Sequence, residues 1–445
     1  MHVHAAYRAK CVSAEEAVRV VASGDWVDYT FCLGQPVALD AALAARKDEL
    51  RGVSIRGGMR MLPLRVLEAD STGEHFSYAS WHLTAFERKL SDAGLITHIP
   101  MVYRNMPLYY RKSLAVNVAM TAVSPMDEEG YFSFSLSNSA TKAILETADT
   151  VIVEVNENLP PIKHGIEHRI HINDVTHVVE GPNNALPTIA PVAPTPVDEA
   201  IAALLLRRIP NGATVQLGIG ALPNAIGSML ALSDIKDLGL HAEMLVDAYM
   251  ALDKAGKITN RHKGTDKGKS MFTFCCGSQN LYDWARNNDT LATGPSNYTN
   301  DPAVLAQNPN MVTINSCVEC DILGQVTSEC AGNRQISGTG GQLDFLTGGY
   351  LAPGGQSFIC CNSTYTDKAG VKHSRIRLAL PEFAAITNPR TLAHCIVTEW
   401  GIADLAGRSI WERAERLIAI AHPDFRDELA RGAEKLGFLR RSNAT

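Results

Sequence analysis

Short apolar runs alternate with amphipathic helical patterns along the whole chain. Ten runs rich in β-branched residues predict buried strands. They cover residues 24–31, 52–58, 97–105, 113–123 and 148–156 in the first part, and 212–220, 269–277, 309–318, 354–362 and 394–401 in the second. Helical patterns such as Pro36 to Arg46 and Thr141 to Thr147 lie between them. Alternating strands and helices predict an α/β fold with largely parallel, buried, open sheets.

The densest proline stretch, GPNNALPTIAPVAPTP, covers residues 181–196 and predicts a domain boundary. It holds five prolines and almost no charge, so it is extended rather than helical. A chain of 445 residues is also long enough for two or three domains. We therefore predict an N-terminal α/β domain over 1–185 and a C-terminal α/β domain over 186–445.

Residues 24–43 and 212–230 share one order of features: strand, glycine turn, proline, helix. This faint duplication predicts two similar domains. Open parallel sheets bind ligands at their carboxyl edges, so a site at the interface of the two domains would follow.

Charge and hydropathy exclude several classes of partner. Lys and Arg number 41 against 47 Asp and Glu, a net charge of −6, so no basic excess favours nucleic acid. The longest apolar stretch, Ala200 to Leu206, is far shorter than the roughly 20 residues of a membrane-spanning helix. The N-terminal residues lack the apolar core of a signal peptide. We expect a cytoplasmic protein without membrane partners.

Ten cysteines are too few for a disulfide scaffold and do not complete a metal site. The adjacent pairs Cys275–Cys276 and Cys360–Cys361 lie in apolar runs and predict buried strand residues. Cys317-x-x-Cys320 has the spacing of a zinc half-site, but no second CxxC or spaced His pair completes it. We predict reduced, structural thiols and no metal.

The segment Gln216 to Ile226, QLGIGALPNAI, predicts a strand, a glycine turn and a helix that opens near Pro223. Exposed backbone N–H groups at such a helix start bind a phosphate or a developing oxyanion. A dinucleotide fingerprint needs a third glycine where Pro223 stands, so the pattern does not favour NAD. A plain strand-to-helix turn remains the alternative.

Glu243 stands in the apolar run GLHAEMLVD. A carboxylate is rarely buried in such a run without a partner or a function. The simple interpretation is a strand-end side chain that reaches solvent or a salt bridge. The functional one is a nucleophilic carboxylate, which is already ionised at neutral pH and needs no general base.

Glycines cluster again in SGTGGQLDF, residues 337–345. At this density, backbone amides can approach a ligand closely, although a flexible turn explains the spacing equally well.

Two further patterns favour structural interpretations. His164-Gly-Ile-Glu-His168 has the spacing of an inverted zinc-peptidase motif, but the prolines before it and the alternation after it predict strand rather than helix. The basic loop Arg261 to Lys269 predicts a solvated turn, and it is also the best local patch for a nucleotide phosphate.

Together these segments resemble the class I coenzyme A transferases, in the acetyl-CoA hydrolase/transferase branch that includes 4-hydroxybutyrate, butyrate and itaconate CoA-transferases. The resemblance spans nearly the whole chain. It rests on VSPMDEEGYFSFSLS (123–137), TADTVIVEVNENLP (147–160), QLGIGALPNAI (216–226), LHAEM (240–244), ISGTGGQLDFLTG (336–348) and the segment 397–429.

The resemblance implies two similar α/β domains with the active site at their interface. It assigns the catalytic glutamate to Glu243. The coenzyme A and oxyanion loops fall on Gly218, Ile219, Gly220, Ala221, Leu222, Pro223 and Asn224, and on Gly340 and Gly341.

The implied mechanism is ping-pong. Glu243 attacks the acyl-CoA carbonyl, the released CoA thiolate attacks the resulting anhydride, and a glutamyl-CoA thioester forms; a second carboxylate reverses both steps. Acetyl-CoA or succinyl-CoA would donate CoA to a carboxylate such as 4-hydroxybutyrate, butyrate or itaconate. CoA thioesters are substrates, so no cofactor is expected, and a homo-oligomer is.

The chain departs from better-known members near Phe31 and Arg60, where the acyl pocket is expected. Arg60 would pair with the distal carboxylate of a dicarboxylic acyl group. The simpler interpretation is an exposed surface arginine. A hydrolase that admits water to the same glutamate and a non-catalytic CoA-binding protein remain the alternative functions.

Overall fold

The computed structural model describes residues 3–190 and 192–440, and these divide into two compact units. Unit 1 comprises the chain up to Ala190 together with Glu243–Leu245 and Lys269–Thr299. Unit 2 comprises the remaining described residues, from 192 onward. Because the units interleave along the chain, a single boundary between residues 185 and 186 stays a prediction.

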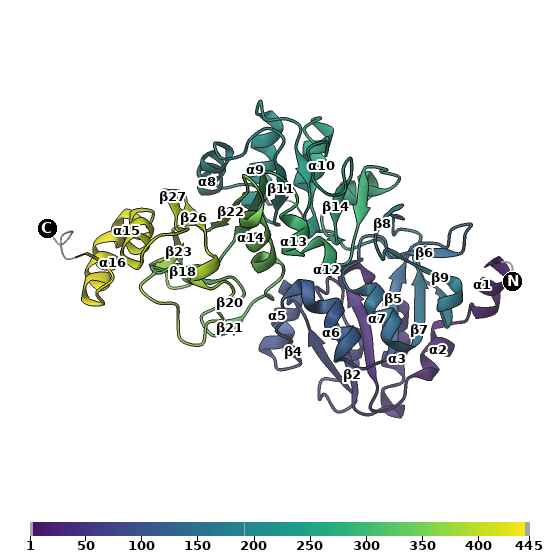
Figure 1. The fold of residues 1–445 in the computed structure, drawn as a ribbon. Helices are drawn as coiled ribbons and strands as arrows, with labels where there is room; N and C mark the ends of the chain where they lie inside the picture. Colours follow the sequence, from purple (N-terminus) through teal and green to yellow (C-terminus); the bar gives the residue numbers. More distant parts are fainter. Residues whose placement is uncertain (1–2, 191, 441–445) are drawn as a thin grey trace. The chain divides into compact units, whose positions relative to one another are not determined.

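Unit 1 is built on an open sheet of seven strands, all parallel (Figure 1). In sheet order the strands are β10 (His177–Glu180), β7 (Ala148–Val155), β5 (Val116–Val123), β1 (Trp26–Phe31), β2 (Val53–Gly58), β3 (Phe76–Ser80) and β4 (Ile96–His98). The central strands are continuous apolar runs because helices cover a parallel sheet.

The helices of unit 1 are α1 (Val3–Lys10), α2 (Ala14–Ala17), α3 (Val37–Ala45), α4 (Arg65–Ala69), α5 (Ala85–Asp92), α6 (Met106–Lys112), α7 (Thr141–Thr147), α11 (Gln279–Ala285) and α12 (Ser296–Thr299). Helices α3 to α7 lie in the connections between these strands, α1 and α2 precede the first strand, and α11 and α12 come from the segment 269–299. Helix α5 begins at a capping box, in which Thr84 and Glu87 satisfy each other's backbone N–H groups. Glu154 of β7 accepts the N–H groups of Ala38 and Leu39, so its carboxylate caps the start of α3.

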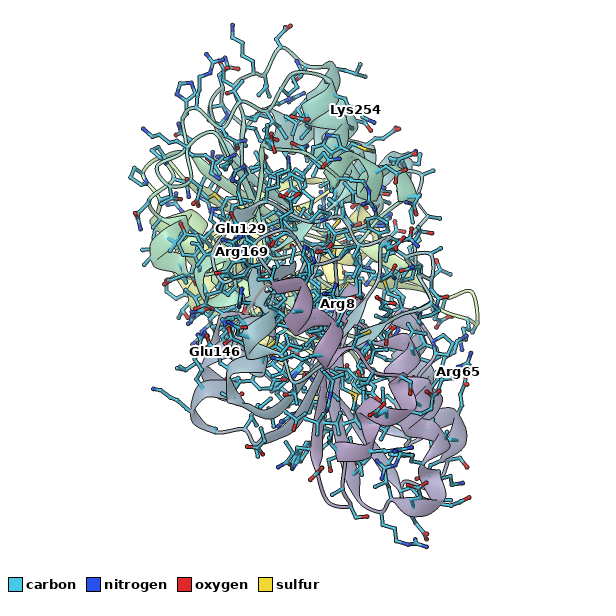
Figure 2. The ribbon with its side chains drawn as sticks, turned by 90° about the vertical axis from the view of Figure 1, so that its right-hand side faces the viewer. Arg8, Arg65, Glu129, Glu146, Arg169 and Lys254 are labelled. Atoms are coloured by element: carbon cyan, nitrogen blue, oxygen red, sulfur yellow. The ribbon has the colours of Figure 1, made fainter. Side chains whose placement is uncertain are left out.

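Small strand pairs complete unit 1. They are β6 (Tyr131–Ser133) with β9 (Arg169–His171), β13 (Met244–Leu245) with β15 (Phe274–Cys275), and β14 (Ser270–Phe272) with β16 (Leu291–Thr293) and β8 (His164–Gly165). Charged side chains line the outside of the β6–β9 pair, where Arg169 lies 3.5 Å from Glu129 and stacks over Tyr131 (Figure 2). His164 is in a strand, as predicted, and not on a helix.

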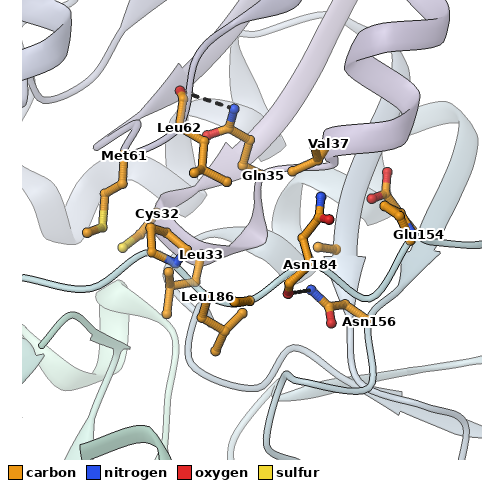
Figure 3. Close-up of a pocket in the computed structure, with 14 residues that line it drawn as sticks. Cys32, Leu33, Gln35, Val37, Met61, Leu62, Glu154, Asn156, Asn184 and Leu186 are labelled. Atoms are coloured by element: carbon orange, nitrogen blue, oxygen red, sulfur yellow. Dashed lines mark hydrogen bonds between the residues drawn. The ribbon is translucent and has the colours of Figure 1, made fainter. Parts of the chain in front are cut away.

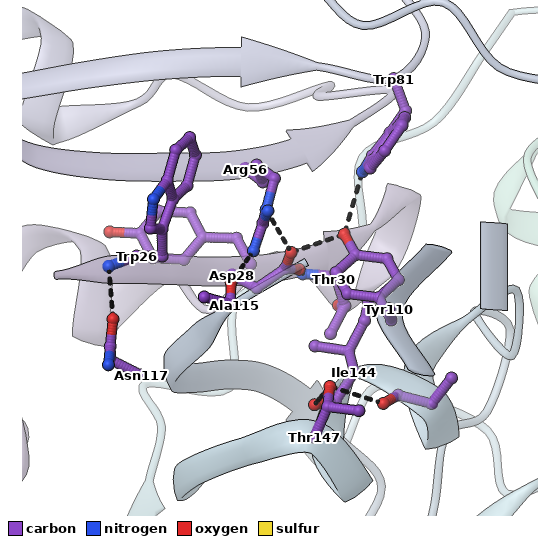
Figure 4. A network of polar contacts seen from close by, with 12 residues as sticks. Trp26, Asp28, Thr30, Arg56, Trp81, Tyr110, Ala115, Asn117, Ile144 and Thr147 are labelled. Carbon is purple, nitrogen blue, oxygen red and sulfur yellow. Dashed lines mark hydrogen bonds and ion pairs between the residues drawn. The ribbon is translucent and has the colours of Figure 1, made fainter. Parts of the chain in front are cut away.

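A buried polar network holds strand β1 in place (Figure 4). The Asp28 carboxylate lies 3.5 Å from the Arg56 guanidinium and accepts the Tyr110 hydroxyl at 2.6 Å. Tyr110 in turn accepts the indole N–H of Trp81 at 2.9 Å. Burial raises the pKa of Asp28, and the charge of Arg56 opposes this. The network fixes β1 up to the residues that precede Phe31.

Unit 2 is built on a six-stranded sheet that is parallel except for its last pair (Figure 1). In sheet order the strands are β12 (Gly239–Leu240), β11 (Thr214–Leu217), β17 (Met311–Ser316), β22 (Gln356–Cys360), β26 (Cys395–Thr398) and β27 (Gly401–Asp404). Shorter strands are β18 (Glu319–Asp321), β19 (Val326–Thr327), β20 (Cys330–Ala331), β21 (Arg334–Gln335), β23 (Thr364–Thr366), β24 (Lys372–Ser374) and β25 (Ile376–Arg377).

The helices of unit 2 are α8 (Pro196–Leu206), α9 (Ala221–Leu232), α10 (Asp247–Lys254), α13 (Pro302–Leu305), α14 (Gln342–Leu351), α15 (Ile410–Ala419) and α16 (Pro423–Lys435). Helices α15 and α16 pack on an apolar core that includes Ile396, Leu405 and Leu417. None of the helices in the described chain is both long and apolar enough to span a membrane.

The predicted α/β class with largely parallel open sheets is confirmed, with three local corrections. The run 97–105 is strand only at its start, because after Pro100 the chain forms a turn at Tyr103–Asn105 and then α6. The run 269–277 forms two short strands outside the six-stranded sheet. Lys263 in the basic loop is fully buried and not solvated.

Lys263 donates a hydrogen bond from Nζ to the carbonyl of Leu240 at 2.9 Å. Burial lowers the pKa of this lysine to about 7, because removing the ammonium from water disfavours its charge. Its place against β12 makes it part of the packing of unit 2 rather than a free phosphate ligand. The exposed Arg261 pairs instead with Asp237 at 3.2 Å.

Candidate active site

Glu243 lies in a bend directly before β13 and is half-buried. Its backbone carbonyl accepts N–H groups from Thr273 at 3.0 Å and from Phe274 at 3.2 Å. These bonds, together with the pairing of Met244 with Phe274, fix the bend against β15 within unit 1. The backbone of Glu243, the predicted nucleophile, is therefore held by two hydrogen bonds and by the strand pairing of the next residue.

Aromatic side chains gather near Glu243 in unit 1. Phe31 lies 5.5 Å from Tyr103 and 5.2 Å from Phe274, measured between ring centroids, and all three are buried. Burial, and then the negative charge of Glu243, raises the pKa of Tyr103 well above its usual value. The Tyr103 hydroxyl, 2.7 Å from that of Ser139, therefore stays protonated. The aromatic group beside Glu243 in unit 1 is therefore neutral.

The end of β1 has an unusual backbone next to this cluster. Thr30 and Cys32, on either side of Phe31, have φ angles of 57° and 49°. A non-glycine residue in this left-handed region is strained, and such strain persists only where surrounding contacts impose it. The contacts that hold the kinked end place the Phe31 ring.

Arg60 supplies those contacts. Its Nε donates to the Tyr78 hydroxyl at 3.0 Å, and its Nη2 donates to the carbonyls of Tyr29, at 3.0 Å, and of Thr30. The side chain is fully buried, so the expectation of a surface arginine is wrong. Its Nη1 has no hydrogen-bond partner in the described chain. This contact set favours a role in positioning β1; a contact with the acyl group stays a prediction.

The residues that directly follow Phe31 in the sequence help to line a small cavity (Figure 3). It encloses about 30 Å³, and Cys32, Met61, Leu62 and Gln35 are among its lining residues. Two of the lining residues also contact the sulfur of Cys276. The Sγ atom of Cys276 lies 2.8 Å from Sγ of Cys32 and 3.5 Å from Sδ of Met61. Gln35 is held by its amide, which donates to the carbonyl of Pro63 at 3.1 Å. Most of the lining side chains are neutral, and the one carboxylate among them, that of Glu154, accepts the N–H groups at the start of α3.

In unit 2, the predicted loop Gly218 to Asn224 forms the turn from β11 into α9. Gly220 precedes the helix with a φ of +121°, a conformation that only glycine adopts readily. No atom would contact a Cβ at Gly218 or Gly220, and Ile219 is 46% exposed. The turn into α9 therefore leaves space beside its two glycines, as close approach of an anion to the backbone requires.

The second glycine loop leads into α14. Gly340 has a φ of +57°, and Gly341 is the residue before the helix. The side chain of Gln342 donates to the carbonyl of Ser316 at 3.3 Å, so the start of α14 lies against the carboxyl end of β17.

A pocket of about 320 Å³ opens at this carboxyl edge of the unit 2 sheet. It is bordered by the α9 turn and by the residues that follow β17 and β22. Its lining residues include Ile219, Ala221, Leu222, Pro223, Ser316, Cys317, Cys361 and Arg375. Parallel sheets bind ligands at this edge.

The structure thus places the predicted residues in two groups. Glu243 and Phe31 lie in unit 1 near one another, and both glycine loops lie at one sheet edge of unit 2. Sequence reasoning missed Tyr103, which stands in a turn that resembled a strand, and Phe274, which was assigned only to a buried strand. No group of three or more His, Cys, Asp or Glu residues in the described ranges could hold a metal ion.

Comparison with known proteins gives consistent matches over the chain. Residues 1–190 match the acetyl-CoA hydrolase/transferase N-terminal domain, and residues 277–433 match the acetyl-CoA hydrolase/transferase C-terminal domain. A butyryl-CoA:acetate CoA-transferase of Anaerostipes caccae is 49% identical over 98% of each chain. A 4-hydroxybutyrate coenzyme A transferase of Clostridium kluyveri is 39% identical over 95% of this chain and 97% of its own.

Among solved structures, RipA from Yersinia pestis has a TM-score of 0.90 at 33% identity. The match covers 99% of this chain and 100% of RipA. The folds therefore correspond from end to end.

Proposed function

Because the chain belongs to the acetyl-CoA hydrolase/transferase family, we propose that it moves coenzyme A between a short monocarboxylic acyl-CoA, such as butyryl-CoA, and acetate. One observation carries the choice of substrate. The aromatic side chains of Phe31, Tyr103 and Phe274 next to Glu243 in unit 1 are neutral. The buried guanidinium of Arg60 donates to backbone carbonyls of β1. Such a surrounding suits an uncharged acyl chain better than a second carboxylate.

In this proposal Glu243 is the covalent nucleophile. Its carboxylate attacks the thioester carbonyl, forming an acyl-glutamyl anhydride and releasing CoA thiolate. The thiolate then attacks the glutamyl carbon, which releases the carboxylate and leaves a glutamyl-CoA thioester. The second carboxylate repeats both steps in reverse. In each step the attacking group and the leaving group come from the substrates or from Glu243, so the reaction needs no further reagent.

Each tetrahedral intermediate carries an oxyanion that needs hydrogen-bond donors. The backbone amides of Ile219, Gly220 and Gly341, and the first amides of α9, supply donors of the required kind. We assign the pocket at the carboxyl edge of unit 2 to the thioester end of CoA. A cytoplasmic location, a homo-oligomer and independence from a cofactor remain predictions from the sequence.

The proposal is tested with the purified chain, butyryl-CoA and a panel of acceptors: acetate, 4-hydroxybutyrate, succinate and itaconate. We expect acetyl-CoA to form with acetate, and free CoA thiol to appear at least about tenfold more slowly without an acceptor. Equal thiol release with and without acetate would identify a hydrolase. Faster transfer to succinate or itaconate than to acetate would reject the monocarboxylate assignment, and no turnover at all would favour a binding protein.

Gly220→Ala tests the α9 turn. A Cβ at a φ of +121° is expected to cost about 1–3 kcal/mol of strain or to shift the turn. Moving one oxyanion donor then lowers kcat by about 100-fold. The matched control is Gly370→Ala, because Gly370 has a φ of +83°, also with no neighbouring atoms, in the β23–β24 hairpin. If both variants lose the same stability and neither loses turnover, the α9 turn is not part of the site.

A further inference from the structure

Three thiols from separate segments gather at the carboxyl edge of the unit 2 sheet. Cys317 directly follows β17, Cys361 directly follows β22, and Cys320 lies within β18. Cys317 and Cys320 both lie close enough to Cys361 to lower the pKa of its thiol. The sequence motif Cys317-x-x-Cys320 therefore has its partner at Cys361, far along the chain.

The strand register places two of these residues directly after neighbouring, paired strand ends. Strands β17 and β22 are parallel neighbours that pair Ser316 with Cys360, and the N–H of Cys317 donates to the carbonyl of Cys360 at 2.9 Å. Cys317 and Cys361 are the next residues on each strand. Neighbouring strands are roughly 5 Å apart, which lies inside the range of about 4.4–6.8 Å between the Cα atoms of a disulfide. A bridge between them requires little movement of the backbone.

The electrostatics make Cys361 the most acidic of the three. Hydrogen bonds from Cys317 and Cys320 and the positive charge of Arg375 hold the pKa of Cys361 well below its usual value, against burial and the charge of Glu399. Arg375 is fixed by its Nη1, which donates to the carbonyl of Val318 at 2.8 Å. The thiols of Cys317 and Cys320 keep their protons, because hydrogen bonding to Cys361 and burial raise their pKa values.

Two of these thiols border a pocket. Cys317 and Cys361, with Arg375, line the pocket of about 320 Å³ described above; Cys317 is half-buried and Cys361 is 5% exposed. The other cysteines with a close sulfur or carboxylate neighbour do not combine a lowered pKa with a place beside this pocket. Cys276 lies against Cys32 in unit 1 with its pKa raised well above the usual value, and Cys395 donates to the Asp404 carboxylate, which with burial raises its pKa to about 12.

We propose that Cys361 is a reactive thiol that exchanges with low-molecular-weight disulfides and that Cys317 resolves the product. The Cys361 thiolate attacks one sulfur of the small disulfide, forming a mixed disulfide and releasing one small thiolate. Cys317, after losing its proton to solvent, attacks the Cys361 sulfur and expels the second small thiolate. Overall, the Cys361 thiolate and the Cys317 thiol form one disulfide with loss of one proton to solvent, and the small disulfide is reduced to two thiolates.

The test is incubation of the whole, reduced protein with oxidised glutathione, followed by alkylation and peptide mass spectrometry without reduction. We expect a Cys317–Cys361 disulfide in the wild type. We expect Cys317→Ser to accumulate glutathione on Cys361, and Cys361→Ser to leave Cys317 unmodified. Cys395→Ser is the matched control, because the Cys395 thiol faces a carboxylate, and this variant should react as the wild type does. In the wild type, Cys395 should be modified at least about tenfold more slowly than Cys361.

Equal modification of Cys361 and Cys395 would overturn the proposal, and so would a Cys317→Ser protein that traps no adduct despite native circular dichroism. A Cys320–Cys361 bridge would reject Cys317 as the resolving thiol. A second arm uses CoA disulfide and rests on the proposed function. Faster reaction than with glutathione supports CoA in this pocket, whereas equal rates contradict that placement and leave the reactive thiol established.

Discussion

Replacing Glu243 by alanine is expected to abolish CoA transfer while the protein stays folded. The proposed reaction passes through covalent bonds to this carboxylate, so its removal leaves no route, and the loss should reach at least about 10,000-fold in kcat. The fold should persist because the bend is held by the backbone carbonyl of residue 243, which the substitution keeps. Steady-state transfer from butyryl-CoA to acetate, beside a thermal melt, measures both effects.

Two further variants test whether the loss of activity is specific to the carboxylate of Glu243. Glu243→Asp shortens the side chain by one methylene, and a misplacement of about 1 Å should cost about 100-fold. Glu129→Ala removes an exposed carboxylate on the outside of the β6–β9 pair (Figure 2) and should have no effect. A Glu243→Ala protein that keeps more than a hundredth of the wild-type rate would show that another group attacks the thioester.

Replacing Arg60 by leucine is expected to lower stability strongly and to slow all acceptors alike. The substitution leaves two buried strand carbonyls and the Tyr78 hydroxyl without their donor, which costs about 3–5 kcal/mol. Once the end of β1 relaxes, the ring of Phe31 shifts, whichever carboxylate is the acceptor. Denaturant unfolding and kcat/KM for acetate, butyrate, succinate and itaconate measure the two effects.

Arg56→Leu is the matched control for Arg60→Leu. It removes another buried arginine, four residues earlier on β2, which contacts the Asp28 carboxylate and not the Tyr29 and Thr30 carbonyls (Figure 4). It should destabilise to a similar degree with a smaller loss of turnover per folded molecule. If Arg60→Leu instead slows succinate and itaconate tenfold or more and spares butyrate, the free Nη1 group reads the acyl carboxylate, as the sequence predicted.

The fold was predictable from the sequence where a strand is buried on both faces. Runs such as residues 113–123 are apolar on both faces, so they predict central strands of a parallel sheet, and β5 and β7 occupy that place. The prediction was incomplete where tertiary contacts decide the pairing partner. Residues 269–277 form strands, as predicted, but these are short and pair with segments of unit 1, and no local pattern specifies that partner.

The site was predictable only in part for the same reason. Gly220 and Glu243 could be identified from their sequence context, because Gly220 is a glycine before a helix and Glu243 is a carboxylate in an apolar run. Arg60 looked like an ordinary surface residue because its partners, Tyr29, Thr30 and Tyr78, come from two other strands. The convergence of Cys317 with Cys361 likewise depends on the order of β17 and β22 in the sheet.

The central claim is that Glu243 carries coenzyme A during turnover. Mass spectrometry of the protein after incubation with butyryl-CoA, without acceptor and at low pH to preserve thioesters, tests it most directly. The account predicts a protein heavier by coenzyme A, with the added mass on the peptide that contains Glu243 and absent from Glu243→Ala. An adduct on any other residue, or steady turnover with no covalent adduct, would contradict it.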